Sequence, residues 1–216
     1  MRAAVLGAND GLISTASLMV GVAAAESSRS AILVAGIAGL TAGALSMAAG
    51  EYVSVSSQLD TERADIAREQ SELANAPDAE LEELTDIYER RGLPRPLARQ
   101  VARELSKHEP LAVHARDELG IDLTALARPI QAATVSAVSF ISGAVLPVLI
   151  VALMPASARM IVTVVATLVG LVLLGSVGAE LGGAPRGRAA VRVFVGGSLA
   201  LMIALGIGRL TGTAFG

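Results

Sequence analysis

An acidic side chain within an apolar segment is the first feature of this sequence that suggests chemistry. Asp10 is the only charged residue in the apolar run from Ala3 to Ala25. A carboxylate within a bilayer costs about 3 kcal/mol or more unless it is protonated, hydrated or liganded, so Asp10 is a candidate functional residue. The alternative is that Asp10 lies one or two turns inside its segment and is simply hydrated.

A second candidate pair, Met47 and Glu51, lies in the apolar segment that follows. The two residues are four apart and therefore share one face of a helix. Methionine in a membrane helix usually serves packing, although its thioether is also a soft metal ligand. Glu51 is either a second acid on the same path or an interfacial residue in contact with water.

Three pairs of potential metal ligands lie at helical spacing in the charged middle of the chain. Side chains three or four apart point the same way, so two such helices can present four carboxylates to one site. Oxygen-rich clusters suit hard or borderline divalent cations. The alternative is a solvated acidic face, paired with Arg63, Arg68, Arg90 and Arg91. The pairs are Glu69 with Glu72, Glu80 with Glu83, and His114 with Glu118.

Apolar segments make up most of the chain and must position these residues. The 216 residues are 53% hydrophobic and 17% charged, with a mean hydropathy of +0.60, whereas soluble domains carry about a quarter charged residues. A membrane helix needs about 20 apolar residues, and runs at 3–25, 31–57, 130–154, 161–179 and 191–210 meet this length approximately. We therefore predict an all-α integral membrane protein with five transmembrane helices. The absence of cysteine excludes disulfides and thiolate metal sites.

The charge is concentrated between Gln58 and Pro129, which hold 16 acidic and 10 basic residues. This distribution predicts three parts: transmembrane helices 1 and 2 in residues 1–57, an acidic helical metal-binding domain in 58–129, and transmembrane helices 3 to 5 in 130–216. Within 58–129, the second span should continue as a helix to Leu73. A second helix should run from Pro77 to Arg91 and a third from Pro94 to His108, which is kinked at Glu109–Pro110 and continues from Leu111 to Leu119.

The basic residues predict the orientation in the membrane. With the N-terminus inside, 14 Lys and Arg face the cytoplasm and 3 face outside, which follows the positive-inside rule. The N-terminus and the acidic domain are then cytoplasmic and the C-terminus is outside. We expect a multi-pass protein of a bacterial plasma membrane, although the sequence does not distinguish this from an internal membrane.

Three short runs carry a resemblance to a known family. They are Gly7-Ala-Asn-Asp-Gly-Leu12, Ala42-Gly-Ala-Leu-Ser-Met-Ala-Ala-Gly-Glu-Tyr-Val-Ser54 and His114-Ala-Arg-Asp-Glu-Leu-Gly120. Together with the order of the spans, these runs resemble the vacuolar iron transporter family over essentially the whole chain. The resemblance implies a dimeric, five-span transporter that moves ferrous iron, and often manganese, out of the cytoplasm in exchange for protons.

The resemblance also implies roles for individual residues. It places Asp10 and Met47 on the translocation path at the dimer interface, and Glu51 is a further acid for that path. Gly39 stands where some members have a path glutamate, which moves any proton coupling to Asp10 and Glu51. The resemblance makes the insert glutamates metal ligands, with His114 as a replacement for methionines of other members. These glutamates are Glu69, Glu72, Glu80, Glu83 and Glu118.

These observations define the expected partners and leave two rival functions. We expect no enzyme activity, no covalent cofactor and no nucleic acid; the partners are divalent cations, protons, the lipid bilayer and a second copy of the chain. Fe²⁺ is the expected ion, and the ligand types do not rank it against Mn²⁺, Co²⁺ or Zn²⁺. One rival is a membrane-tethered ferritin-like module, although the insert lacks paired Glu-x-x-His motifs. The other is a membrane scaffold. An ATP-driven pump is disfavoured because no P-loop is present.

Overall fold

The computed structural model describes residues 2–26 and 28–215, and within them it contains helices and no strand. Five of these helices are long and apolar enough to cross a membrane. They are α1 (Arg2–Ala25), α2 (Arg29–Asn75), α6 (Pro129–Leu153), α7 (Arg159–Leu181) and α8 (Arg186–Phe215). The predicted fold class, an all-α protein with five membrane-spanning helices, is confirmed.

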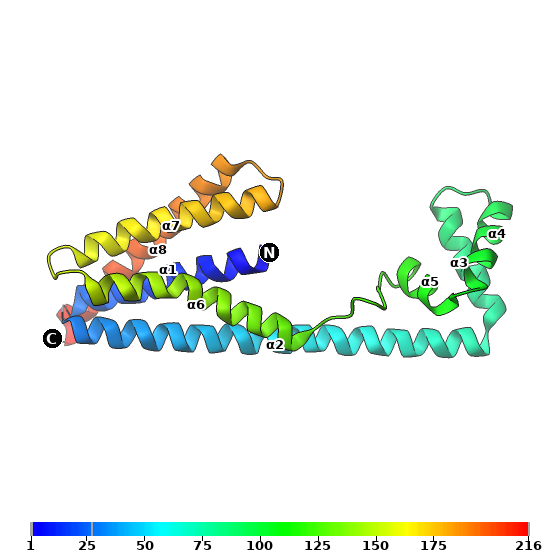
Figure 1. Cartoon of the computed structure of the whole chain (residues 1–216), viewed down its shortest axis with the longest axis horizontal. Helices are drawn as coiled ribbons and strands as arrows, with labels where there is room; N and C mark the ends of the chain where they lie inside the picture. Colours follow the sequence, from blue (N-terminus) through cyan, green and yellow to red (C-terminus); the bar gives the residue numbers. More distant parts are fainter. Residues whose placement is uncertain (1, 27, 216) are drawn as a thin grey trace. The chain divides into compact units, whose positions relative to one another are not determined.

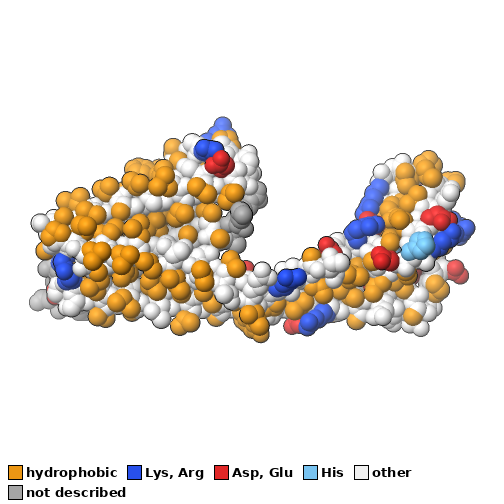
Figure 2. All heavy atoms as spheres, viewed as in Figure 1, with side chains coloured by type: hydrophobic (Ala, Val, Ile, Leu, Met, Phe, Trp, Pro, Cys, Tyr) orange, Lys and Arg blue, Asp and Glu red, His pale blue; other side chains and the backbone are white. Residues whose placement is uncertain are grey.

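The chain forms two compact units (Figure 1). The membrane unit comprises Met1–Tyr52 and Ile130–Gly216, and the insert unit comprises Val53–Pro129. Helix α2 is continuous through Tyr52 and contributes its two halves to the two units. Hydrophobic side chains cover most of the visible face of the membrane unit, whereas charged side chains and histidine gather on the insert unit (Figure 2).

Helix α1 is the centre of packing in the membrane unit. It contacts both α7 and α8, and Ala16 and Val20 join Leu201 of α8 in one buried cluster. Met19, further along α1, packs with Ile32 of α2 and Val151 of α6 in a second cluster. Helix α1 is therefore held on several sides, which fixes the residues along its length.

Glycines allow α1 and α6 to approach at backbone distance. A Cβ atom added at Gly143 of α6 would overlap the carbonyl of Ala8, and one added at Gly11 of α1 would overlap the carbonyl of Phe140. Small residues permit such contacts between helices in lipid, where van der Waals packing drives association. Because this contact brackets Asp10 in the sequence, it fixes the part of α1 that carries the acid.

The insert unit contains the end of α2 and three shorter helices, α3 (Pro77–Arg90), α4 (Arg95–Ser106) and α5 (Pro110–Asp117). Its core consists of apolar side chains from α3, α4 and α5. Arg95 holds α4 to α3 through contacts of 2.7–2.9 Å with Glu82, Asp86 and Glu89. The core members are Leu84, Ile87, Tyr88, Ala98, Ala102 and Val113.

The predicted kink at Glu109–Pro110 is wrong, because the structure has a break there. Helix α4 ends at Ser106 and α5 begins at Pro110, with Glu109 in a non-helical conformation as the N-terminal cap. Proline lacks an N–H and crowds the preceding turn, so it starts a new helix more readily than it continues one. The break lets α5 take a direction of its own.

We expect Gly143→Ala to destabilise the membrane unit, because its new methyl group would overlap the Ala8 backbone. Overpacking of this kind costs about 1–3 kcal/mol of stability. Thermal unfolding of the full chain in detergent, detected by size-exclusion elution, measures this loss. Gly206→Ala on α8 is the matched control, since a Cβ atom there meets nothing within 4 Å. Equal melting temperatures for both variants would contradict the close approach.

Candidate metal site and membrane cavity

Four side chains of the insert unit converge on one point. Glu69, Glu80, His114 and Glu118 each offer one ligand atom, and these atoms all lie within 4.8 Å of one another. Nδ1 of His114 is 2.9 Å from Glu69 Oε1, 3.1 Å from Glu118 Oε2 and 3.7 Å from Glu80 Oε2. The side chains of His114 and Glu69 are only 1% and 2% exposed. Three carboxylates and one imidazole therefore surround a buried centre.

Two sharp chain reversals bring these residues together. Helix α2, which carries Glu69, ends at Asn75, and Pro77 starts α3 immediately after it, so that Glu80 lies in the first turn of α3. Pro110 in turn starts α5. A carboxylate in a first turn also interacts favourably with the positive end of the helix dipole.

The insert core then sets the direction of His114. The preceding residue, Val113, is buried in that core. The end of α5 is fixed by Asp117, which accepts hydrogen bonds from Tyr88 Oη at 2.7 Å and from Arg91 at 2.8 Å. Glu118 follows directly as the C-terminal cap of α5. Tyr88, buried and bonded to this carboxylate, has its pKa raised to about 12.

The protein alone does not satisfy the carboxylates at this centre. Neutral imidazole has one N–H, and Nδ1 can donate to only one of the surrounding oxygens. With the hydrogen bond at Glu118 Oε2, Glu69 Oε1 is buried with no hydrogen-bond partner among the described residues. If Nδ1 instead presents its lone pair, four electron-rich atoms face one another. A cation bound between them satisfies all four, because carboxylate oxygen and imidazole nitrogen both ligate borderline divalent metals.

Electrostatics at the cluster favour protons in the absence of a cation. Burial raises the pKa of Glu69 to about 7, with further increases from Glu118, Glu80 and Glu72 that outweigh the opposite effect of His114. Burial also raises the pKa of Glu80, and the neighbouring Glu83 carboxylate raises it further. A desolvated carboxylate resists ionisation unless a cation neutralises it. Metal ions and protons therefore compete for this site.

The remaining predicted insert ligands lie beside the cluster. Glu72 and Glu83 are exposed, and their negative charges raise the pKa of Glu80. Arginines near the glutamates make their ion pairs elsewhere: Arg68 pairs with Asp65, and Arg91 with Asp117. Sequence spacing grouped Glu69 with Glu72 and Glu80 with Glu83, whereas the structure buries one member of each pair and leaves the other in water.

In the membrane unit, Asp10 and Met47 line one cavity of about 260 Å³ between α1, α2 and α6. Met47 also packs against the buried cluster formed by Ala44, Phe140 and Ala144, so it has a packing role as well. Asp10 is exposed on the surface of the single chain. Glu51, one turn after Met47, is half-buried.

Sequence reasoning missed several polar residues of this region. Ser14 and Thr15 line the cavity with Asp10, and the Oγ1 atom of Thr15 is buried without a hydrogen-bond partner among the described residues. Asn9, whose Oδ1 atom is likewise unpaired, lines an adjoining cavity of about 540 Å³ that includes Asp10 and Met47. Ser14 lies four residues after Asp10, so helical periodicity alone would have identified it.

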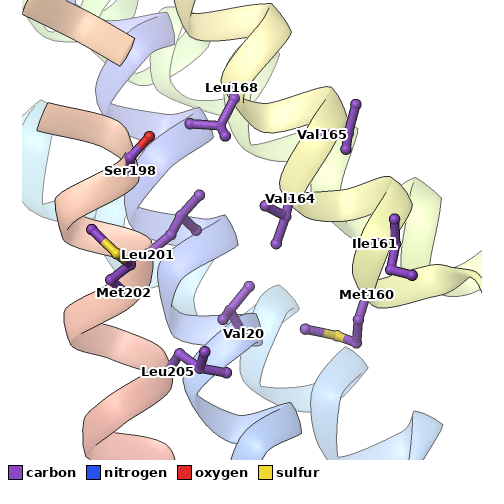
Figure 3. A pocket seen from close by; sticks show the side chains of 10 residues that line it. All are labelled: Val20, Met160, Ile161, Val164, Val165, Leu168, Ser198, Leu201, Met202 and Leu205. Atoms are coloured by element: carbon purple, nitrogen blue, oxygen red, sulfur yellow. The ribbon is translucent and has the colours of Figure 1, made fainter. Parts of the chain in front are cut away.

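A third hollow of the membrane unit has a different chemistry. This groove of about 400 Å³ lies between α1, α7 and α8 and is lined by nine apolar side chains and Ser198 (Figure 3). It offers no charged ligand, so entry of a desolvated cation would be uncompensated. The cavity of Asp10 and Met47 is the better candidate for an ion path.

The fold and these sites define a class: a membrane protein of five spanning helices with a helical unit that gathers carboxylates and an imidazole. The profile of the VIT family matches residues 1–209. The chain is 44% identical to the "Vacuolar iron transporter" of Acanthamoeba castellanii, over 99% of this chain and 79% of that protein. It is 38% identical to "Vacuolar iron transporter homolog 2" of Arabidopsis thaliana, over 98% of this chain and 84% of that protein.

The chain belongs to the VIT family. "VIT-like transporter 1b" of Glycine max is another relative, 38% identical over 99% of this chain and 77% of that protein. The resemblance found in the short sequence runs is thereby confirmed. These relatives are named as transporters and not as enzymes, in agreement with the expectation that the chain is not an enzyme.

We expect metal affinity of the insert to rise with pH, because a proton on Glu69 must leave before a cation binds. With the pKa of Glu69 raised to about 7, competition by this one proton weakens binding roughly tenfold between pH 8 and pH 6. Calorimetric titration of the full chain with Mn²⁺ in detergent measures this slope. Glu104→Gln, which removes an exposed carboxylate paired with Lys107, should leave it unchanged; a flat pH profile would argue against Glu69 as a ligand.

The structure further predicts a ranking among the six insert ligands proposed from the sequence. Single changes of the four converging residues, such as Glu69→Gln or His114→Ala, should weaken Mn²⁺ or Fe²⁺ binding by about tenfold or more. Loss of a residue that only hydrogen-bonds a metal ligand already has an effect of this size. Glu72→Gln and Glu83→Gln should cost severalfold less, since both side chains are exposed. Equal losses for both groups, measured by the same titration, would contradict the ranking.

Proposed function

We propose that this protein exports divalent metal, Fe²⁺ and also Mn²⁺, from the cytoplasm by proton antiport as a homodimer. The observation that carries the proposal is the buried convergence of Glu69, Glu80, Glu118 and His114 in a chain whose other unit is apolar and membrane-spanning. Kinship with proteins named as vacuolar iron transporters supports iron as the cargo.

The insert unit acts first, as the collector of ions. The buried Glu69 and Glu80 and the half-buried Glu118 attract cations, and the exposed Glu72 and Glu83 extend the negative potential to the surface of the unit. Carboxylate and imidazole ligands favour borderline divalent metals over monovalent ions. A focused negative potential also raises the local concentration of cations. In this proposal residues 58–129 are the metal-binding domain.

Asp10 and Met47 then carry the ion within the membrane. The carboxylate supplies charge, the thioether supplies a soft ligand, and the hydroxyl groups of Ser14, Thr15 and Ser46 line the same cavity. These groups replace part of the water that the ion loses on entry. Glu51 lies one turn beyond Met47 on α2 and serves as a relay between the cavity and water.

Proton coupling follows from the use of one carboxylate for two cations. Among the described residues, Asp10 is the only acidic one that lines the cavity. It holds the metal as a carboxylate and returns as a protonated acid, because an empty and charged carboxylate in the membrane is costly. Outward movement of metal and inward movement of protons are thereby linked at a single side chain.

A second copy of the chain completes the path. Asp10 lies exposed on a single chain, among apolar side chains that are also exposed, such as Leu6 on α1 at 68% and Leu45 on α2 at 66%. A carboxylate facing lipid is unfavourable, so this surface needs a partner. A second copy meets the need with the same residues by two-fold symmetry.

Orientation and location complete the proposal. The excess of Lys and Arg on one side places the N-terminus and insert in the cytoplasm, with the C-terminus outside a bacterial plasma membrane. Collection by the insert and export through the membrane unit then share one direction. A ferritin-like oxidising module remains the rival, and transport distinguishes it.

We expect Asp10→Ala to abolish movement of metal in sealed proteoliposomes, because the variant lacks the only acid of the cavity. Uptake of Fe²⁺ and Mn²⁺, with and without a pH gradient, measures transport and its coupling. Glu180→Gln is the matched control, since Glu180 is exposed and pairs with Arg186. Metal uptake by Asp10→Ala at the native rate would refute this mechanism. Metal uptake by the unmodified protein that is no faster than in liposomes without protein would refute transport.

A further inference from the structure

Leu18 of α1 separates two cavities of the membrane unit. The first is the cavity of Asp10 and Met47. The second, of about 410 Å³, lies between α1 and α8 toward the loop that joins α1 to α2, and its lining includes Ser17, Glu26 and Thr211. Leu18 is the one described residue that lines both.

The two cavities lie along successive turns of α1. Asp10, Ser14 and Leu18 recur every four residues, Val22 continues the series, and Glu26 directly follows the end of the helix. Each step of four residues turns about 40° around the axis, so Leu18 lies about midway between the two acids, both around and along the helix. With a rise of 1.5 Å per residue, Leu18 is about 12 Å along the axis from either acid.

Gly39 of α2 gives Leu18 its position. A Cβ atom added at Gly39 would lie 2.5 Å from Cδ2 of Leu18, so the leucine occupies the space that any other side chain would need. Leu18 is 41% exposed and belongs to none of the buried clusters of the described chain. In the single chain no buried cluster therefore fixes the rotamer of Leu18.

The second cavity is lined mostly by apolar side chains and glycines, and its polar groups come from Ser17, Glu26 and Thr211. Glu26 contributes a carboxylate, whose Oε1 atom accepts a hydrogen bond from the backbone N–H of Ser28 at 2.8 Å. Ser17 Oγ is buried without a hydrogen-bond partner among the described residues, and Thr211 adds a hydroxyl. Oxygen atoms of this kind suit a divalent cation that is regaining its water.

We propose that Leu18, seated over Gly39, is the barrier between the Asp10 cavity and an exit vestibule lined by Ser17, Glu26 and Thr211. The barrier works by excluding water, as apolar constrictions do in channels. An ion held by Asp10 and Met47 cannot pass an unhydrated leucine, and movement of that side chain opens the way to Glu26. This inference rests on the proposed function, since it concerns the exit of the same cargo.

Because the chain contains no cysteine, single cysteines can report which cavity a water-soluble reagent reaches. Ser46→Cys places a thiol in the Asp10 cavity and Thr211→Cys places one in the vestibule. An impermeant methanethiosulfonate is added to either face of sealed proteoliposomes, and the face from which Thr211→Cys reacts defines the vestibule side. From that side, Ser46→Cys should react at least tenfold more slowly than Thr211→Cys while Leu18 is present.

Truncation of the leucine should remove this difference. In the Leu18→Ala background Ser46→Cys should react at least tenfold faster from the vestibule side, whereas Leu18→Phe should give no increase. Thr211→Cys should react at the same rate in every background, which also reports correct folding. If Leu18→Ala elutes as misfolded protein, the rate of Ser46→Cys is measured in the Leu18→Val background instead. Leu173→Ala is the matched control, because this 61% exposed leucine lines neither cavity.

Two results would overturn the barrier: an unchanged rate for Ser46→Cys when Leu18 is truncated, or equal rates for the two thiols while Leu18 is present. Neither measurement requires metal or transport. A protein that transports but shows an unchanged thiol rate refutes the barrier alone. A protein with the predicted rates but no transport refutes the proposed function and leaves the barrier supported.

Discussion

Three carboxylate oxygens converge on Nδ1 of His114 in the interior of the insert unit, and this unfavourable grouping is the interaction on which the site depends. Removing carboxylates from water costs free energy that one imidazole N–H cannot offset. Glu69 responds with a pKa raised to about 7, mainly through burial. The folded unit therefore holds these groups together at a cost that either protons or a bound cation would relieve, and binding of a metal ion here would depend on pH.

The remainder of the insert unit supplies the rigidity that keeps these groups together. Asp117 shows the opposite electrostatic response: hydrogen bonds from Arg116, Tyr88 and Arg91 lower its pKa. This satisfied carboxylate fixes the end of α5, and the next residue, Glu118, is held at the cluster. Asp117 and Glu118 are neighbours in the sequence but differ in role, because Asp117 is paired with arginine side chains and Glu118 is not.

The membrane unit faces the same constraint in a less polar medium. Its cavity contains one acid, Asp10, together with a thioether and hydroxyl groups. Close packing through Gly11 and Gly143 holds the surrounding helices at backbone distance. In the proposed mechanism, Leu18 separates the polar residues along α1 from the vestibule, so the same helix provides both ligands and an apolar barrier. Rigid packing and one movable side chain are compatible because Leu18 lies outside the buried clusters.

The five spans, the long helix that continues past the second span, and the helix start at Pro77 could all be predicted from the sequence, because hydropathy and proline act locally. The sequence also identified Glu69, Glu80, His114 and Glu118 as candidate ligands through helical spacing and family resemblance. The exposure of Glu72 and Glu83 and the position of Leu18 over Gly39 became evident only from the packing of the helices. These outcomes depend on how helices far apart in the sequence pack against each other, and periodicity within one helix contains no information on the partner that covers its face.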